Sequence, residues 1–345
     1  MKRILITGGC GFIGSHTSLI LIQKGYEIVI IDSNIRSSEQ VIQNIYKAMK
    51  KSNIKDLSRL KFYKGDLRDH KFLEKVFINS QKIDAVIHFA GMKSVTESID
   101  FSIDYWDVNV AGTVLLLRVM NKYQCNKIIY SSSASVYGNS VEVPFKEDSH
   151  LKPLNPYSNT KYVAELLLND IYLSNPNNWN IINLRYFNPI GANSNNFLGE
   201  DLNFSENIFP KLFKSYRRKD TIFHVFGNDW PTPDGTCIRD YIHIDDLAQG
   251  HVAALEKLFE EKMNLSCFNL GTGKGTSVLD LIKTFCETNK IKIKYDFVER
   301  REGDVPILVA DISSAIQNLK WGPTKSLEDM CRDGFRWFLN FQKCL

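Results

Sequence analysis

A glycine-rich turn between a short apolar strand and a helix-length segment is the feature that most restricts the fold of this chain. The run Arg3 to Thr7 leads directly into GGCGFIG, residues 8 to 14, and a helix-like segment follows. Glycines at positions 8, 11 and 14 let backbone N–H groups approach a pyrophosphate at the positive helix terminus, which bulkier side chains would block. Gly8, Gly11 and Gly14 therefore predict the first β–α unit of a nucleotide-binding domain.

An acidic residue at the end of the next strand fits the same motif. Asp32 follows Gly14 at close to the roughly 20 residues expected for the carboxylate that binds the ribose hydroxyls of an adenosine. Such a carboxylate repels a 2′-phosphate, which favours NAD over NADP. Arg36 is the one nearby residue that could accept a 2′-phosphate instead.

The first half of the chain alternates β-branched runs with helix-length segments. Continuous apolar runs are typical of parallel strands buried on both faces, and right-handed crossovers then give a doubly wound sheet. We therefore predict an α/β fold with a Rossmann-type doubly wound parallel sheet. The predicted strands are Arg3 to Thr7, Glu27 to Ile31, Leu60 to Lys64, Ala85 to Phe89, Lys127 to Ser131 and Ile181 to Arg185.

The pattern loosens after about residue 188. Residues 193 to 207 are rich in Asn, and residues 227 to 236 are dense in Gly, Pro and Asp, which predicts long loops of a kind that is usually functional. We expect a cofactor-binding domain over 1–187, to which 237–262 returns. A smaller mixed α/β substrate-binding domain is expected over 188–236 and 263–345.

Tyr157 and Lys161 lie four residues apart in YSNTK, so a helix places them on one face. A tyrosine is a poor base at neutral pH, but a neighbouring lysine cation and a positive nicotinamide stabilise its phenolate. Ser133, at the end of the preceding strand, could hydrogen-bond the same substrate hydroxyl. Alone, such a short pattern more often reflects a helix cap with a solvated lysine. Its place after a dinucleotide motif favours a proton relay.

Composition excludes several classes of protein. The formal net charge is +4, from 43 Lys and Arg against 39 Asp and Glu, with no long basic cluster, which argues against a nucleic-acid partner. No segment approaches the roughly 20 apolar residues of a membrane span. The apolar run that precedes the first glycines is too short for the core of a signal peptide. The seven cysteines are scattered without a CxxC pair, so no metal site is expected. We expect a cytoplasmic protein without a membrane partner.

Motifs along nearly the whole chain resemble those of one enzyme family. They include TGGCGFIGSH, HFAGMKSV, NVAGT, SSSASVYG, YSNTK and LRYFNPIGA, followed by FGNDWPTPDGTCIRDYIHIDDLAQGH, FNLGTGKGTSVLDLI and RREGDVP. The chain resembles the extended short-chain dehydrogenases/reductases, and within them the UDP-glucose 4-epimerases. The dinucleotide and YxxxK motifs mark the superfamily, whereas PTPDGTCIRDYIH and RREGD are specific to the epimerase-like branch.

The resemblance, together with the strand-end turns, implies a set of cofactor and catalytic residues. The catalytic residues are Ser133, Tyr157 and Lys161. The residues expected to hold NAD are Gly8, Gly11, Phe12, Ile13, Gly14, Asp32, Asn34, Asp66, Leu67, Phe89, Ala90, Gly91, Lys93, Asn109, Tyr157, Lys161 and Phe187.

The resemblance also implies a UDP-hexose substrate. Arginines offer paired donors to a diphosphate, and a carboxylate can accept from ribose hydroxyls. The expected substrate residues are Lys93, Ser133, Tyr157, Asn188, Asn207, Arg239, Arg301, Asp304 and Leu308. In the family, a bulky aromatic near position 308 is associated with UDP-glucose and UDP-galactose alone. The intermediate Leu308 predicts activity on that pair and leaves room for UDP-GlcNAc and UDP-GalNAc.

The implied reaction is reversible inversion at C4 of the UDP-hexose through a 4-keto intermediate with transient NADH. Two alternatives share the fold. A nucleotide-sugar 4,6-dehydratase carries an Asp-Glu pair just after the serine, where this chain has Ala134 and Ser135. A non-catalytic NAD(H)-sensing protein typically loses the Tyr/Lys pair. The family further implies a homodimer, compatible with amphipathic helices around 101 to 122 and 157 to 174, whose apolar residues could equally pack on the sheet.

Overall fold

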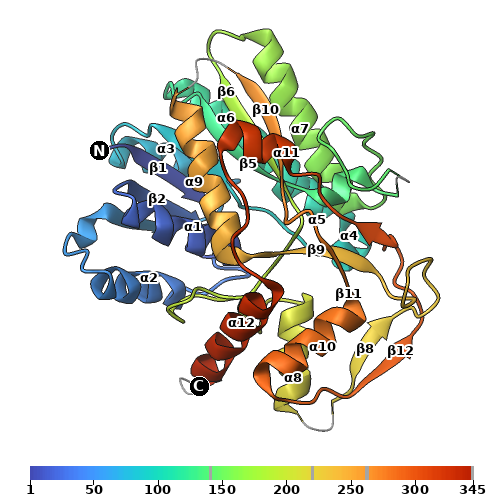
Figure 1. Ribbon diagram of the computed structural model, residues 1–345. Helices are drawn as coiled ribbons and strands as arrows, with labels where there is room; N and C mark the ends of the chain where they lie inside the picture. Colours follow the sequence, from blue (N-terminus) through green and yellow to red (C-terminus); the bar gives the residue numbers. More distant parts are fainter. Residues whose placement is uncertain (140–141, 219–220, 261–263, 343–345) are drawn as a thin grey trace.

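A computed structural model describes residues 1–139, 142–218, 221–260 and 264–342 of the chain, and its largest element is a seven-stranded parallel sheet (Figure 1). The strand order is β10-β6-β5-β4-β1-β2-β3, with the chain reversing direction across the sheet at β1. This is the Rossmann-type doubly wound order, and the predicted fold class is confirmed. The strands are β1 (Arg3–Thr7), β2 (Glu27–Asp32), β3 (Leu60–Lys64), β4 (Ala85–His88), β5 (Lys127–Ser133), β6 (Asn180–Tyr186) and β10 (Leu265–Leu270).

Six of these strands lie where the sequence predicts them, with ends that differ by at most two residues. Strand β10 is the seventh and was not predicted. It lies in the segment that the sequence analysis placed in the smaller domain, and it pairs in parallel with β6 at the edge of the sheet.

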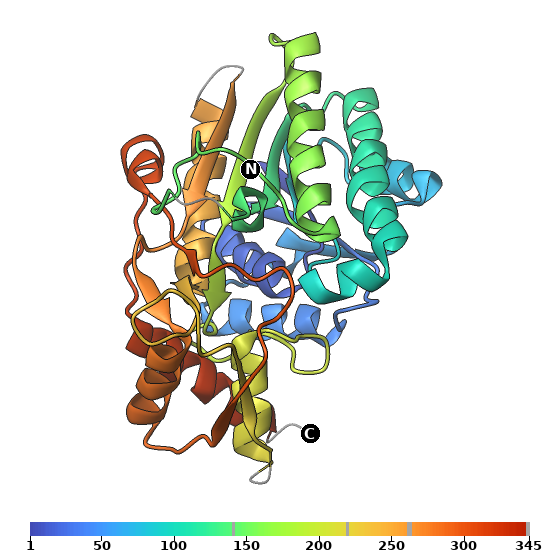
Figure 2. The ribbon, with the colours of Figure 1, turned by 90° about the vertical axis from the view of Figure 1, so that its right-hand side faces the viewer.

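Helices cover both faces of the sheet, as Figure 2 shows for α7 on one side and α9 on the other. Successive strand residues point to opposite faces, so Ile4 and Ile6 contribute to one core while Leu5 contributes to the other. The first face is covered by α1 (Phe12–Gln23), α2 (Gln40–Lys51), α9 (Ile244–Glu260) and α11 (Ser313–Leu319). The second face is covered by α3 (His70–Asn79), α6 (Gly112–Lys122) and α7 (Pro156–Ser174).

Short helical elements follow the carboxyl ends of β4 and β5. After β4 the chain forms α4 (Val95–Asp100) and α5 (Ser102–Trp106), and a π-helical turn, η2 (Asp107–Ala111), joins α5 to α6. Such π-turns are frequent at functional sites. The remaining short elements are the 3₁₀ turns η1 (Leu57–Arg59) and η3 (Ala134–Tyr137).

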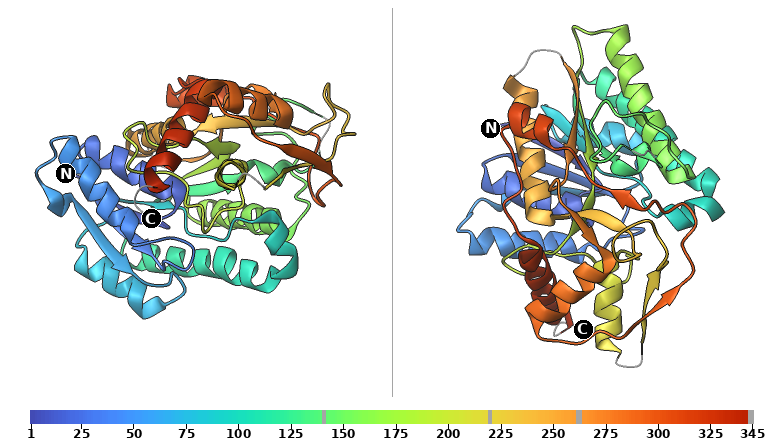
Figure 3. Two further views of the ribbon diagram at one scale, coloured as in Figure 1. Left: turned by 90° about the horizontal axis from the view of Figure 1, so that it is seen from below. Right: turned by 45° about the vertical axis from the view of Figure 1, so that its right-hand side comes forward.

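A second assembly of elements continues from the carboxyl ends of β6 and β10 (Figure 3). It has its own aromatic core, which includes Phe209, Phe213, Phe285 and Phe338. Its four-stranded sheet contains β7 (Asn188–Ile190), β9 (Ile238–His243), β11 (Gly275–Ser277) and β13 (Ile307–Leu308). A separate pair is formed by β8 (Phe223–Phe226) and β12 (Tyr295–Val298). The helices are α8 (Ile208–Arg217), α10 (Val278–Asn289) and α12 (Leu327–Gln342).

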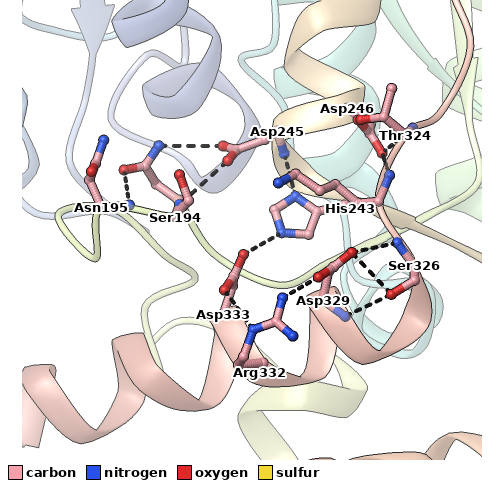
Figure 4. A network of polar contacts seen from close by, with 12 residues as sticks. Ser194, Asn195, His243, Asp245, Asp246, Thr324, Ser326, Asp329, Arg332 and Asp333 are labelled. Atoms are coloured by element: carbon pink, nitrogen blue, oxygen red, sulfur yellow. Dashed lines mark hydrogen bonds and ion pairs between the residues drawn. The ribbon is translucent and has the colours of Figure 1, made fainter.

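Helix α12 is tied to the strand–helix junction of β9 and α9 by the polar network in Figure 4. The buried His243 ring accepts a 3.0 Å hydrogen bond from the Asp245 backbone at Nδ1, and its Nε2 lies 3.5 Å from Asp333 of α12. Asp246 accepts a 3.0 Å hydrogen bond from the backbone N–H of Thr324, just before α12. These contacts hold the C-terminal helix against the rest of the chain.

None of the helices in the described ranges is long and apolar enough to cross a membrane.

Candidate active site

The glycine turn after β1 packs so tightly that side chains would not fit. Gly8 has a φ of +69°, and a Cβ there would lie 2.6 Å from the Ala90 nitrogen. A Cβ on Gly14 would lie 2.4 Å from the Gly8 carbonyl oxygen, and one on Gly11 would lie 3.2 Å from the same atom. The packing of the turn itself therefore requires glycine at these positions. A tight glycine turn at the start of a helix is the arrangement that binds a pyrophosphate in dinucleotide-binding folds. Phe12 and Ile13 form the first turn of α1 and are partly buried against the core.

Asp32 lies at the end of β2, beside this turn. One carboxylate oxygen accepts hydrogen bonds from the Asn34 backbone at 2.9 Å and the Ser37 hydroxyl at 2.8 Å, and the other accepts from the Cys10 backbone at 2.9 Å. Asn34 has a φ of +56°, which lets the loop fold back onto the carboxylate. The carboxylate is thus fixed at the position that the motif predicts.

Asp66 and Leu67 follow the adjacent strand β3, whose end is joined to β2 by a 3.0 Å bond from Gly65 to the Asp32 carbonyl. Asp66 is ion-paired with Arg68 at 2.6 Å, and this contact lowers the pKa of the Asp66 carboxyl. Leu67 is buried in the core of the second face. Both residues lie on the same strand edge as Asp32.

The turn after β4 contains Phe89, Ala90 and Gly91 and is held by Asn109. The Asn109 side chain accepts from the Met92 backbone at 2.8 Å and donates to the Met92 carbonyl at 3.0 Å. It lies in the π-helical turn η2, which aims it back at the strand end. A Cβ on Gly91 would lie 3.0 Å from Asn109 Oδ1 and 3.8 Å from Lys161 Nζ, so this turn reaches the lysine. The Phe89 ring packs at 4.8 Å on His251.

Tyr157 lies in the first turn of α7. The Asn155 side chain accepts from the Ser158 backbone at 2.9 Å, and Pro156 occupies the first helical position, so this sequence starts a helix here. Burial raises the pKa of Tyr157, and a side-chain hydrogen bond with Ser133 opposes that rise. Ser133 ends β5 and accepts a 2.9 Å hydrogen bond from the Ser135 hydroxyl. The predicted Ser and Tyr are therefore brought together.

Lys161 follows one turn later and is buried. Its Nζ donates a 2.6 Å hydrogen bond to the Ser131 carbonyl. Burial lowers the pKa of Lys161 to about 8, and the charge of Glu165 opposes that lowering. The ammonium is therefore held close to its charge transition at neutral to mildly alkaline pH.

A buried ion pair behind Lys161 escaped the sequence analysis. Glu165 accepts from Arg185 at 2.7 and 3.0 Å and also accepts a short hydrogen bond from Ser132. Its position four residues after Lys161 places it on the same helix face, which was the available signal. Without Arg185, the Glu165 carboxylate would be an unpaired buried charge.

The residues expected to bind the substrate belong to the second assembly of elements. Asn188 begins β7, and its buried Oδ1 has no hydrogen-bond partner, so it can accept a hydrogen bond from a ligand. Arg239 of β9 donates to the Val305 carbonyl at 2.7 Å and lies 3.4 Å from Asp304. Leu308 pairs with Arg239 in the register of β13 and β9 and packs on the cluster of Ala134 and Phe187. The Leu308 side chain therefore lies near the end of β5, where Ser133 is located.

Arg301 is held separately, with its guanidinium 4.2 Å above the Phe226 ring, an aromatic residue that the sequence analysis did not single out. Lys93 and Asn207 are both bound to one carboxylate, that of the buried Glu200, at 2.8 and 2.6 Å. Glu200 lies in the Asn-rich loop, and nothing in its local sequence marks it. Among the described residues, no group of three or more His, Cys, Asp or Glu is arranged to hold a metal ion.

Comparison with known proteins places these features in one family. Residues 5–334 match the family model of GDP-mannose 4,6 dehydratase. UDP-glucose 4-epimerase 4 of Oryza sativa subsp. japonica is 44% identical over 337 residues, covering 97% of this chain and 90% of that protein.

Two solved structures superpose over the full length of both chains with a TM-score of 0.93. One is UDP-glucose 4-epimerase from Bifidobacterium longum in complex with NAD+ and UDP, at 38% identity. The other is UDP-glucose 4-epimerase from Stenotrophomonas maltophila with bound NAD and formylated UDP-arabinopyranose, at 36% identity.

The fold and the Ser-Tyr-Lys grouping define an extended short-chain dehydrogenase/reductase. The identity over almost the whole of both chains narrows this class further. The chain belongs to the UDP-glucose 4-epimerase family.

Proposed function

We propose that this protein catalyses the reversible C4 epimerisation of a UDP-hexose, with NAD as its cofactor. The observation that carries the proposal is the grouping of Tyr157, Lys161 and Ser133 at the strand edge that the glycine turn also faces. A tyrosine and a buried lysine at this place supply proton transfer next to a dinucleotide.

The cofactor is held along the carboxyl edge of the sheet. Gly8, Gly11 and Gly14 give the pyrophosphate access to the start of α1, and Asp32 binds the adenosine ribose. The turn after β4, positioned by Asn109, supports the nicotinamide end beside Lys161. Bound there, NAD would supply a hydride acceptor and donor for C4 of the sugar, which is the redox chemistry that reversible inversion at that carbon requires.

The protein's own part in the chemistry is proton transfer at the C4 hydroxyl. Tyr157 removes this proton and later returns it, while Ser133 hydrogen-bonds the same hydroxyl. Burial alone disfavours the tyrosinate, so the nearby Lys161 ammonium is needed to stabilise it. Lys161 therefore acts electrostatically.

The UDP half of the substrate is anchored and the sugar is left free to turn. In this proposal, Arg239 and Arg301 bind the diphosphate, Asp304 binds the ribose, and Asn188 and Asn207 bind the region between nucleotide and sugar. The unpartnered Oδ1 of Asn188 supports its part. Leu308 borders the sugar, and its intermediate size admits UDP-GlcNAc and UDP-GalNAc beside UDP-glucose and UDP-galactose.

Epimerisation has to be distinguished from 4,6-dehydration of the sugar, because the matching family model is that of a 4,6-dehydratase. Ala134 is a buried apolar residue, and the Ser135 hydroxyl is bonded to Ser133. Neither position offers a carboxyl group for the elimination step. This favours epimerisation.

We further propose a cytoplasmic homodimer with a role in galactose metabolism. An open hollow of about 690 Å³ lies over α5, η2 and α6 and is lined by Ile103, Trp106 and Leu115 among others. Ile103 is 81% exposed and Trp106 is 39% exposed, and Leu166 and Leu173 of the adjacent α7 are also exposed. A two-fold partner that covers this apolar face would remove it from water. The cysteines of the described ranges are free thiols, in keeping with a reducing compartment.

Conversion of UDP-galactose to UDP-glucose by the purified protein tests the function. We expect both sugars at equilibrium from either starting compound, with no change in mass. Accumulation of a product lighter by one water would identify a dehydratase, and binding of NAD without turnover would identify an NAD(H)-sensing protein.

A further inference from the structure

Arg36 is the only basic side chain in the loop that closes over Asp32, residues 33–38. This loop is fixed to the Asp32 carboxylate through the Asn34 backbone and the Ser37 hydroxyl, which flank Arg36. An arginine in this loop is the residue type that accepts the 2′-phosphate of NADP in dinucleotide-binding folds. The sequence alone thus carries two opposed signals, a repelling carboxylate and an attracting guanidinium.

The structure resolves the conflict, because Arg36 is engaged elsewhere. Its Nη1 lies 2.6 Å from Oε2 of Glu97 in α4, and its Nη2 bonds the other carboxylate oxygen of the same residue. Such a two-bond contact fixes the direction of the guanidinium plane. The Arg36 side chain is 46% exposed, so the ion pair, and not packing, determines where it points.

Glu97 is free to bind Arg36 because its usual local partner is occupied. Ser94 caps α4 and accepts a 3.3 Å bond from the Glu97 backbone, the first half of a capping box. In a complete box the glutamate reaches back to the backbone N–H of the cap residue. Here the Ser94 N–H donates instead to the Tyr105 hydroxyl at 3.0 Å. The Glu97 carboxylate is thereby released toward the Asp32 loop.

Tyr105 also fixes the released carboxylate. Its hydroxyl donates to Glu97 Oε2 at 2.9 Å, and the side chain is completely buried. The Tyr105 ring meets the Tyr157 ring edge-on at 6.5 Å. Glu97 is therefore held between the half-exposed Arg36 guanidinium and the buried Tyr105 hydroxyl, and its contact with Arg36 lowers the pKa of its carboxyl.

We propose that Glu97 determines cofactor selectivity by holding Arg36 away from the position of a 2′-phosphate. Asp32 repels the phosphate, and Glu97 removes the one cation of the loop that would compensate for it. The inference rests on the proposed NAD-dependent function and adds to it a residue, distant in sequence, that contributes to the choice of cofactor. An exposed ion pair such as this one adds little to the stability of the fold.

The test is nucleotide competition on the purified full chain. The purified protein is incubated with an equimolar mixture of NAD+ and NADP+ until bound nucleotide has exchanged, and unbound nucleotide is then removed. The nucleotides that remain bound are released by denaturation and quantified. We expect Glu97→Gln to raise the bound NADP-to-NAD ratio about tenfold, the value of one charge-assisted contact. The double variant Glu97→Gln/Arg36→Ala should return to the parent ratio. Glu74→Gln removes an equivalent surface carboxylate, paired with Lys122, and should leave the ratio unchanged.

An unchanged ratio in Glu97→Gln, or a rise that persists in the double variant, would overturn the inference. If Glu97→Gln does not fold, Tyr105→Phe provides the second variant, because it frees the Ser94 N–H for Glu97 and should shift the ratio in the same direction. A parent protein that retains NADP in excess, or neither nucleotide, contradicts the proposed NAD dependence itself.

Discussion

The Lys161 ammonium lies 2.6 Å from the Ser131 carbonyl oxygen, in a buried position one helical turn after Tyr157. This single hydrogen bond, from a helix to the strand end behind the candidate site, fixes the cation where it can stabilise a tyrosinate. Burial has a cost, since it lowers the pKa of Lys161 to about 8.

The pKa of Lys161 predicts a fall in activity at alkaline pH. The lysine is charged below its pKa and neutral above it, so the charge that supports Tyr157 is lost as the pH rises through about 8. We expect kcat to decline over that range. Arginine stays charged, so Lys161→Arg should move the decline to higher pH whatever its absolute rate. Activity of the parent protein that keeps rising toward pH 10, where free tyrosine and lysine titrate, would contradict this role.

Glu200 should act on substrate binding. One of its oxygens accepts from Lys93, Ser205 and Asn207 at 2.8, 2.7 and 2.6 Å. Removal of its charge in Glu200→Gln should loosen these side chains and raise KM for the UDP-sugar about tenfold, with a much smaller change in kcat. Glu206→Gln, at an exposed position of the same loop region, is the control. Steady-state kinetics that do not distinguish the two variants would remove Glu200 from the site.

Leu308 should set the balance between plain and N-acetylated sugars. It packs near Ala134 and Phe187, where a larger ring would narrow the space for the sugar. Leu308→Tyr should lower kcat/KM for UDP-GlcNAc relative to UDP-glucose by about tenfold, and Leu308→Met should not. Equal turnover ratios in parent and tyrosine variant would reject this gate.

Ile103 should contribute to a dimer interface. It is 81% exposed on α5, and a buried charge there would be costly in an assembled pair. Ile103→Glu should weaken association about tenfold or more, as measured by sedimentation equilibrium. Ile316→Glu, at an exposed isoleucine on α11, should leave association unchanged. A parent protein that sediments as a monomer would contradict the dimer.

The features that the sequence predicts best are those that depend on neighbours along the chain. The glycines of residues 8 to 14 are required by contacts within one turn, and Tyr157 and Lys161 share a face because of helix geometry. The class of fold follows from apolar strands buried on both faces. Strand β10 was missed because LSCFNL at the sheet edge is only half buried and interrupts its apolar residues with polar ones.

The residues that sequence reasoning missed depend on contacts between distant segments. Glu97 meets Arg36 across 61 positions and Glu200 meets Lys93 across 107, so the pairing follows from the order of strands in the sheet. A lone glutamate in a helix or loop looks like a solvated charge. Burial of Glu200 and Glu165 becomes visible only when the chain is folded.

The proposed reaction depends on Tyr157, which transfers the proton of the C4 hydroxyl. The most direct measurement is the epimerisation rate of Tyr157→Phe, with bound NAD quantified in the same preparation after denaturation. Loss of one general acid–base group predicts a kcat about 10²- to 10⁴-fold lower, with the NAD content of the parent. Epimerisation at the parent rate by a variant that retains NAD would show that Tyr157 does not transfer this proton.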